Sequence, residues 1–159
     1  MKITVRLLFA ALCAAFALSN GVSGADANSY SGMFWNQTKD AIFEIRLTDS
    51  SEGPSIEGIT RWSMKPVVDA RNPDPALRTR SLKDVTFLWG FTYDARKNRW
   101  KDGKVYDPNN GKTYDAKMEL ENGGDTLKMR GYIGVSLLGR TARFERVQAK
   151  DLPVTFDTD

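Results

Sequence analysis

Residues 85–147 decide the fold of this chain, and they read VTFLWGFTYDARKNRWKDGKVYDPNNGKTYDAKMELENGGDTLKMRGYIGVSLLGRTARFERV. Short runs in which apolar and polar residues alternate recur along this stretch, and each run ends at Gly, Asn, Asp or Pro. Such runs are typical of β-strands joined by tight turns. The stretch therefore predicts an antiparallel meander. Its expected strands are residues 85–93, 99–106, 113–120, 126–133 and 141–147.

The same alternation extends toward the N-terminus, where residues 30–38, 41–48 and 55–62 form three more expected strands. In the second of these, apolar side chains alternate with Glu44 and Arg46, as in a strand with one buried and one wet face. About eight sequential strands result, with no helix-length amphipathic segment. Closing such a meander on itself removes its exposed edges, so we expect an all-β, up-and-down antiparallel barrel of about eight strands. A two-sheet sandwich is the alternative.

Residues 63–83 interrupt the strand pattern with Pro66, Pro73 and Pro75. Asp74 followed by Pro75 is typical of a helix start, which predicts a short helix near residues 75–80 within an irregular connection. A long connection of this kind is either a functional binding loop or a strap across one end of a barrel.

The composition excludes several classes of function. The chain contains no histidine, which removes His-ligated metals and the usual Ser-His-Asp catalytic group. Acidic and basic residues are interspersed without a basic run, so no nucleic-acid partner is expected. Asp107, Asn109 and Asp115 are loosely similar to a calcium loop, but Gly111 occupies a ligand position and no Glu closes the loop. We therefore expect neither a metal nor another cofactor.

The first 27 residues have the pattern of a secretory signal peptide. Lys2 and Arg6 precede an apolar run at residues 7–18, and small residues suit cleavage after Ala25 or Ala27. We therefore expect a periplasmic or secreted protein with no membrane span after cleavage. The expected domains are the signal peptide at 1–27, the barrel at 28–148 and a polar tail at 149–159. Cleavage would also remove Cys13, the only cysteine, and with it any disulfide.

Several motifs in the chain, taken together, resemble a family of secreted bacterial proteins known as domain of unknown function two-one-four-seven. They are Asn72-Pro-Asp-Pro-Ala-Leu-Arg78, Leu88-Trp-Gly-Phe91, Gly103-Lys-Val-Tyr-Asp-Pro108 with Gly111-Lys-Thr-Tyr114, and Arg130-Gly-Tyr-Ile-Gly134 with Leu138-Gly-Arg140. The resemblance covers roughly residues 32–147. It implies a lipocalin-like barrel in a bacterial envelope or secreted protein, and it implies no established activity.

Lipocalin-like barrels often begin with Gly-x-Trp, whose Trp packs against an Arg of the last strand. Here Gly32 and Trp35 are separated by one extra residue, so the match is loose. The resemblance implies that Trp35 and Arg146 form a cation–π contact that closes the barrel, with a structural role.

The aromatic face of residues 85–93 is the strongest candidate for a ligand site. Large aromatics are more often core than cavity wall, and both interpretations apply here. On the second, we predict Phe87, Trp89 and Phe91 as cavity wall. The predicted polar contacts of the ligand are Tyr106, Tyr114 and, near the mouth, Arg78.

Three functions remain open on the sequence alone. The favoured hypothesis is a non-catalytic protein that binds a small, mainly apolar molecule. The alternative is an envelope protein-interaction module whose barrel core is filled and whose protein partner is unidentified. A weaker alternative is a hydrolase that uses carboxylates at the barrel mouth. The polar cluster of residues 69–80, with two Asp and three Arg, either holds an anionic ligand group or pairs internally and caps the short helix.

Overall fold

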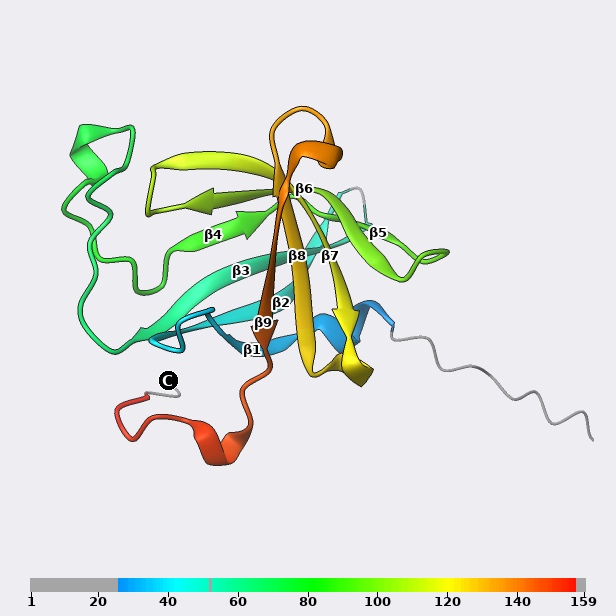
Figure 1. The fold of residues 1–159 in the computed structure, drawn as a ribbon, viewed down its shortest axis with the longest axis horizontal. Helices are drawn as coiled ribbons and strands as arrows, with labels where there is room; N and C mark the ends of the chain where they lie inside the picture. Colours follow the sequence, from blue (N-terminus) through cyan, green and yellow to red (C-terminus); the bar gives the residue numbers. More distant parts are fainter. Residues whose placement is uncertain (1–25, 52, 157–159) are drawn as a thin grey trace, which may run out of the picture.

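The computed structural model describes residues 26–51 and 53–156, which fold into one antiparallel β-barrel (Figure 1). The strands are β1 (Gly32–Trp35), β2 (Ala41–Ser50), β3 (Gly53–Ser63), β4 (Thr86–Trp89), β5 (Thr92–Asp94), β6 (Arg99–Asp107), β7 (Lys112–Glu121), β8 (Thr126–Tyr132) and β9 (Arg140–Glu145). The short 3₁₀ helices are η1 (Ala27–Tyr30), η2 (Pro75–Leu77), η3 (Asn122–Gly124), η4 (Ser136–Leu138) and η5 (Ala149–Asp151). Except for Asp26 and Ala27, the predicted signal peptide lies outside the described residues.

The strands pair in the order in which they occur in the chain. The sheet runs β1-β2-β3-β4-β6-β7-β8-β9, and β5 adds to β6 beside β4. The barrel closes where Phe34 bridges Arg146, and the Val147 amide donates to the Met33 carbonyl at 2.9 Å. The predicted all-β, up-and-down architecture is therefore confirmed.

One predicted strand is divided in two. Residues 85–93 form β4 and β5 because Gly90 adopts φ +72°, a left-handed conformation that interrupts an extended strand. The predicted first strand is also shorter than expected, since Tyr30 belongs to η1 and β1 begins at Gly32. The predicted short helix after Asp74 is present as η2, and the Asp74 carboxylate caps it by accepting from the Ala76 amide at 2.9 Å.

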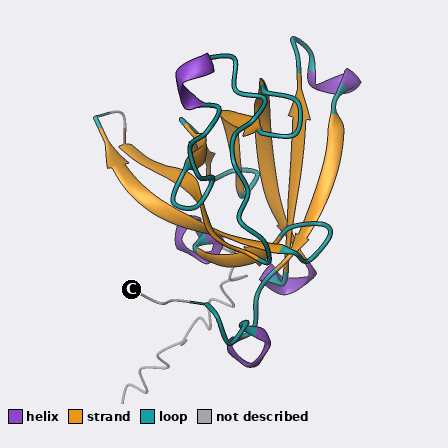
Figure 2. Ribbon diagram, turned by 90° about the vertical axis from the view of Figure 1, so that its left-hand side faces the viewer, coloured by secondary structure: helices purple, strands orange, loops and turns teal. Residues whose placement is uncertain are grey.

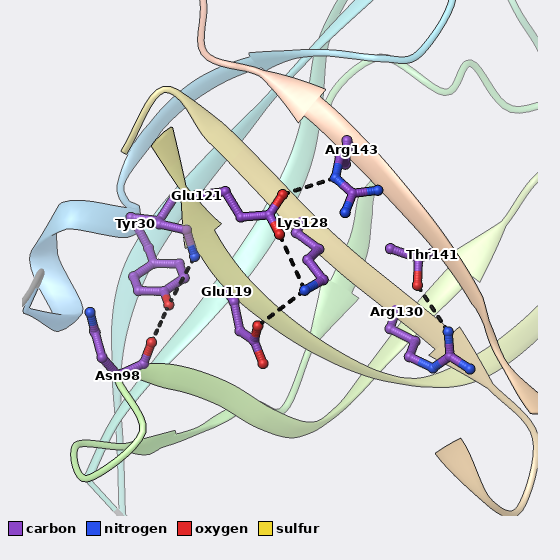
Figure 3. A network of polar contacts seen from close by, with 9 residues as sticks. Tyr30, Asn98, Glu119, Glu121, Lys128, Arg130, Thr141 and Arg143 are labelled. Atoms are coloured by element: carbon purple, nitrogen blue, oxygen red, sulfur yellow. Dashed lines mark hydrogen bonds and ion pairs between the residues drawn. The ribbon is translucent and has the colours of Figure 1, made fainter. Parts of the chain in front are cut away.

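The half of the barrel that contains η1 is filled with side chains. Trp100 and Tyr30 are fully buried there, with their rings edge to face at 6.3 Å between centroids. The Tyr30 hydroxyl donates to the Asn98 carbonyl at 2.7 Å and accepts from the Leu120 amide at 3.3 Å (Figure 3). Burial raises the pKa of Tyr30 to about 12. We call this packed region the closed half.

Arg146 fastens the closed half to the start of the chain. Its guanidinium donates to the carbonyls of Gly124 at 2.8 Å, Ser31 at 2.7 Å and Ser29 at 2.7 Å. The same group lies 4.5 Å from the centroid of the Phe34 ring.

The predicted cation–π contact between Arg146 and Trp35 is wrong by one residue, because Arg146 contacts the ring of Phe34. Successive side chains of a strand point to opposite faces, so Phe34 points into the barrel toward Arg146. Trp35 instead packs edge to face against Trp62, with ring centroids 6.1 Å apart. The extra residue in the loose Gly-x-Trp match is the reason for the shift.

The outer face of the last strands carries charged side chains, as the alternation predicted. Glu121 accepts from Arg143 at 2.9 Å and lies 3.2 Å from the Lys128 ammonium group (Figure 3). These pairs are solvent-exposed, so each stabilises the fold by at most about 1 kcal/mol.

Candidate ligand cavity

The other half of the barrel contains a cavity of about 990 Å³ that opens to solvent. The turns and connections at residues 36–40, 64–85, 107–112 and 132–140 lie at this end, which we call the mouth. Figure 2 shows the longest of them, the strap at residues 64–85, in front of the strands. The barrel is therefore filled in one half and hollow in the other.

Aromatic rings separate the two halves. Phe43 packs edge to face against Phe87 at 5.4 Å and against Phe144 at 5.1 Å, and it stacks on Phe34 at 5.8 Å. Phe43 has only 6% of its surface exposed, so its ring forms the floor of the cavity and the top of the core. The remaining apolar wall consists of Ile42, Leu82, Val85, Val105, Met129, Ala142 and parts of the β8–β9 connection.

The three predicted wall residues have different positions in the structure. Phe87 lines the cavity. Phe91 belongs to the core of the closed half, where it is 2% exposed and packs on Gly103. Trp89 lies outside the cavity lining and is 40% exposed. The turn at Gly90 separates Phe91 from the other two residues, and Trp89 lies beside this turn, at the last position of β4.

The two predicted tyrosines both line the cavity, but their hydroxyl groups differ in role. The Tyr114 hydroxyl accepts from the Asn110 side chain at 3.0 Å, near the mouth. The Tyr106 hydroxyl donates to the Asp69 carboxylate at 2.5 Å and is therefore already used within the protein. Tyr114 remains the better candidate for a polar contact with a ligand.

Asp69 is a fully buried carboxylate that holds the strap to the barrel. Besides Tyr106, its donors are the Asn72 side chain at 2.7 Å and the Arg80 guanidinium at 2.8 Å and 3.0 Å. Burial alone would raise the pKa of Asp69, but the hydrogen bonds from Tyr106, Asn72 and Arg80 outweigh it and lower that pKa. Burial and the adjacent Asp69 raise the pKa of Tyr106 to about 12.

The strap also contacts the turn between β6 and β7. Gly111 adopts φ +70°, and a Cβ atom there would collide with the Arg71 carbonyl. The Asp107 side chain shapes the turn by accepting from the Asn109 amide and the Asn110 side chain, each at 2.9 Å. The motifs around Asn72, Tyr106 and Gly111, far apart in sequence, thus form one structural unit.

The polar cluster of the strap pairs internally, as one of the two interpretations predicted. Asp69 pairs with Arg80, Asp74 caps η2, and the Arg78 Nε donates to the Asn72 carbonyl at 2.9 Å. Arg78 is exposed and lies outside the cavity lining, which corrects its predicted position at the ligand. Its guanidinium instead donates a hydrogen bond to the backbone of the strap.

Several cavity residues were not proposed as ligand contacts from the sequence. The alternation placed Phe43, Ala142 and Phe144 on the apolar faces of their strands. It predicted that these side chains point into the barrel, but not whether they lie in the core or beside the cavity. Arg140 lines the mouth, but the sequence analysis names it only as part of the family motif Leu138-Gly-Arg140 and assigns it no role. Its position at the first residue of a strand, after a glycine-flanked apolar run, was the available signal.

The described residues include neither a cluster of metal ligands nor a membrane-spanning helix. Residues 26–51 and 53–156 contain no group of three or more His, Cys, Asp or Glu that could hold a metal ion. Within the same residues, no helix has the length and hydropathy needed to cross a membrane.

Comparisons with known proteins agree with the barrel. The model of the family described as "Uncharacterized protein conserved in bacteria (DUF2147)" matches residues 32–146. A solved structure described as "Protein HP1028 from the human pathogen Helicobacter pylori belongs to the lipocalin family" superposes with a TM-score of 0.60 and 24% identity. The match covers 77% of this chain and 85% of that one, and at this identity it shows a lipocalin-like fold. No curated protein matches the sequence.

Proposed function

Since this chain belongs to the DUF2147 family of uncharacterized bacterial proteins and folds as a lipocalin-like barrel, we propose that it binds one small, mainly apolar molecule without catalysis. The observation that carries the proposal is the cavity of about 990 Å³ in the open half of the barrel. Ligand pockets of roughly 300–1,000 Å³ typically hold small molecules and cofactors.

The lining indicates the chemical character of the ligand. Rings and aliphatic side chains from Phe43, Phe87, Phe144 and their neighbours form the deep wall. Polar groups such as the Tyr114 hydroxyl and the Arg140 guanidinium lie toward the mouth. A molecule with an apolar body and a polar end would place its body inside and its polar end at the rim.

The state of the acidic residues supports binding over hydrolysis. A general acid needs a carboxyl group whose pKa is raised toward neutrality. Among the described carboxyl groups with a resolved shift, the pKa is lowered in each case, at Asp40, Asp69 and Glu121. Hydrogen bonds to the ionised form are the main lowering cause for each group.

We also propose that the protein is exported and cleaved after Ala25. The Asp26 side chain accepts from the Ser29 amide at 3.0 Å and so caps η1, and Ala27 packs against the core. Cleavage after Ala27 would remove this cap, whereas cleavage after Ala25 keeps it. The intact mass of protein isolated from the periplasm or medium tests this, and a mature chain that starts at Asn28 would contradict it.

Equilibrium binding of an uncharged apolar fluorophore, N-phenyl-1-naphthylamine, tests the binding function. The Ala142→Phe substitution adds a ring inside the cavity, and Thr92→Phe adds the same ring at an exposed position of β5. Saturable binding to the wild type and to Thr92→Phe, with at least about tenfold weaker binding to Ala142→Phe, is expected because the added ring takes up apolar space in the cavity that the probe would occupy. Equal affinity in all three proteins would refute the proposed site.

A further inference from the structure

The connection between β8 and β9 presents its apolar side chains to solvent. Ile133, Val135, Leu137 and Leu138 are 68%, 61%, 84% and 81% exposed. Exposed apolar residues are ordinary when they are scattered singly, but a group on one short segment marks an interaction site. We call residues 133–139 the apolar loop.

The apolar loop is held in place rather than left free. The Arg130 side chain donates to the Ser136 carbonyl at 2.6 Å, the Leu137 carbonyl at 2.9 Å and the Thr141 hydroxyl at 2.9 Å. Figure 3 shows the last of these contacts, across β8 and β9. At the end of the loop, a Cβ atom on Gly139 would collide with the Gly131 carbonyl. The fold therefore fixes the loop backbone while its apolar side chains face water.

The apolar loop borders the entrance to the cavity. Ile133 and Leu138 contribute to the cavity lining, as do Leu82 and Val85 at the end of the strap. A surface that covered the apolar loop would therefore lie next to the opening through which an apolar ligand must pass.

The charge around the mouth is positive. The mouth segments at residues 36–40, 64–85, 107–112 and 132–140 carry eight basic and five acidic residues. Asp69 and Asp84 pair with arginines, and the Asp40 side chain accepts from Asn36 and Thr38. Arg140 and Lys112 are exposed and form no ion pair with the residues that the structure describes.

We propose that the apolar loop docks the barrel mouth on a lipid bilayer with anionic headgroups. Aliphatic side chains beside unpaired basic groups match the boundary between acyl chains and anionic headgroups, where peripheral segments lie about 5–10 Å deep. A stable protein interface usually has about 20–30 residues on each side, whereas the apolar loop has only seven residues. The inference goes beyond the proposed function, because docking requires no bound ligand.

A fluorophore on the loop tests this proposal. In the full chain carrying Cys13→Ser, nitrobenzoxadiazole is attached at Leu137→Cys or, as the matched position, at Ala95→Cys in the exposed turn at the closed end. With vesicles of equal phosphatidylglycerol and phosphatidylcholine, emission from position 137 should rise about threefold, as expected for a site that enters the headgroup–acyl boundary. Position 95 should stay unchanged. An equal response at both positions, or none at position 137, overturns the proposal.

Sedimentation with the same vesicles gives a second measurement. The Val135→Asp/Leu137→Asp variant should lose the loop-dependent fraction of binding, while Val154→Asp, at a fully exposed position in the tail, should keep it. Arg140→Gln should weaken binding about fivefold, the effect of one basic residue near an anionic surface. Retention of binding in the double variant overturns the proposal. So does a loop signal that appears without vesicles and grows with protein concentration, because it identifies a second copy of the chain as the occupant.

Docking and ligand binding can fail independently. N-phenyl-1-naphthylamine binding is measured without vesicles, and neither Val135 nor Leu137, the two positions changed in the double Asp variant, lines the cavity. Loss of vesicle binding with unchanged probe affinity is the result expected from the proposal.

Discussion

The closed and open halves of the barrel have the same strands but differ in what occupies their interior. In the closed half, Trp100, Tyr30 and Phe91 fill the interior of the barrel, and Arg146 hydrogen-bonds to the start of the chain. In the open half the strands surround a cavity, and the buried Asp69 network holds a strap beside its mouth. Stability therefore resides mainly in one half, which leaves the other free to remain hollow.

The largest effect should come from the centre of the closed half. Trp100→Ala removes a fully buried indole and should lower the free energy of unfolding by about 3–5 kcal/mol, the usual cost of deleting a buried aromatic side chain. Denaturant unfolding measures this change. Ala142→Phe, which adds volume to the hollow half, serves as the comparison. If Trp100→Ala were no more destabilising than Ala142→Phe, the two halves would not differ as described.

Arg146 should contribute the next largest amount. Arg146→Met leaves the carbonyls of Gly124, Ser31 and Ser29 without their charged donor, and we expect a loss of about 3 kcal/mol in unfolding free energy. Trp35→Ala is the matched test of the alternative pairing. Should Trp35→Ala cost as much as Arg146→Met and the double variant cost no more than either, Trp35 would be the partner of Arg146 after all.

Asp69 tests the open half through pH. Its pKa in the folded protein lies below its ordinary value, so Asp69 stabilises the fold above the unfolded pKa of about 3.9 and this contribution is lost as pH falls through the folded pKa. Asp69→Asn should lower stability by about 2 kcal/mol at neutral pH and flatten the acid side of the stability profile. An unchanged acid profile would contradict the assigned network.

Asp69→Asn should also change the alkaline side of the stability profile, through Tyr106. The pKa of Tyr106 is raised to about 12, so its contribution to stability is present below the unfolded pKa of about 10 and is lost as pH rises toward the folded value. Without the Asp69 charge the pKa of Tyr106 should fall. Tyrosinate absorbance during alkaline titration measures the shift, and Tyr30, whose pKa is also about 12 but which lies in the closed half, is the internal reference.

The smallest expected effects are changes in probe affinity, which should differ between variants of Phe87 and Trp89. Phe87→Ala removes part of the cavity wall and should weaken N-phenyl-1-naphthylamine binding about tenfold, since burial of one aromatic side chain is worth about 1.5–3 kcal/mol. Trp89→Ala should leave the affinity unchanged, because Trp89 lies outside the lining. A larger loss of affinity for Trp89→Ala would place the ligand elsewhere.

The sequence predicted the fold better than the site, for a physical reason. Alternation with period two determines which face a side chain occupies, so the sequential barrel and the burial of Phe43 and Ile45 followed from it. It does not determine where a strand ends, and the turn at Gly90 separated Phe91 from Phe87 and left Trp89 at an exposed strand end. Contacts between distant segments, such as Tyr106 with Asp69, have no periodic signal at all. The one-residue shift from Trp35 to Phe34 shows how far a motif match alone can mislead.

Native mass spectrometry of the mature protein, isolated from its own compartment and compared with the denatured chain, tests the central claim most directly. The account predicts a discrete extra mass on the wild type that is released on denaturation and is absent from Ala142→Phe. An identical apo mass for both proteins, even after exposure to lipid extract, would contradict a binding function for the open half.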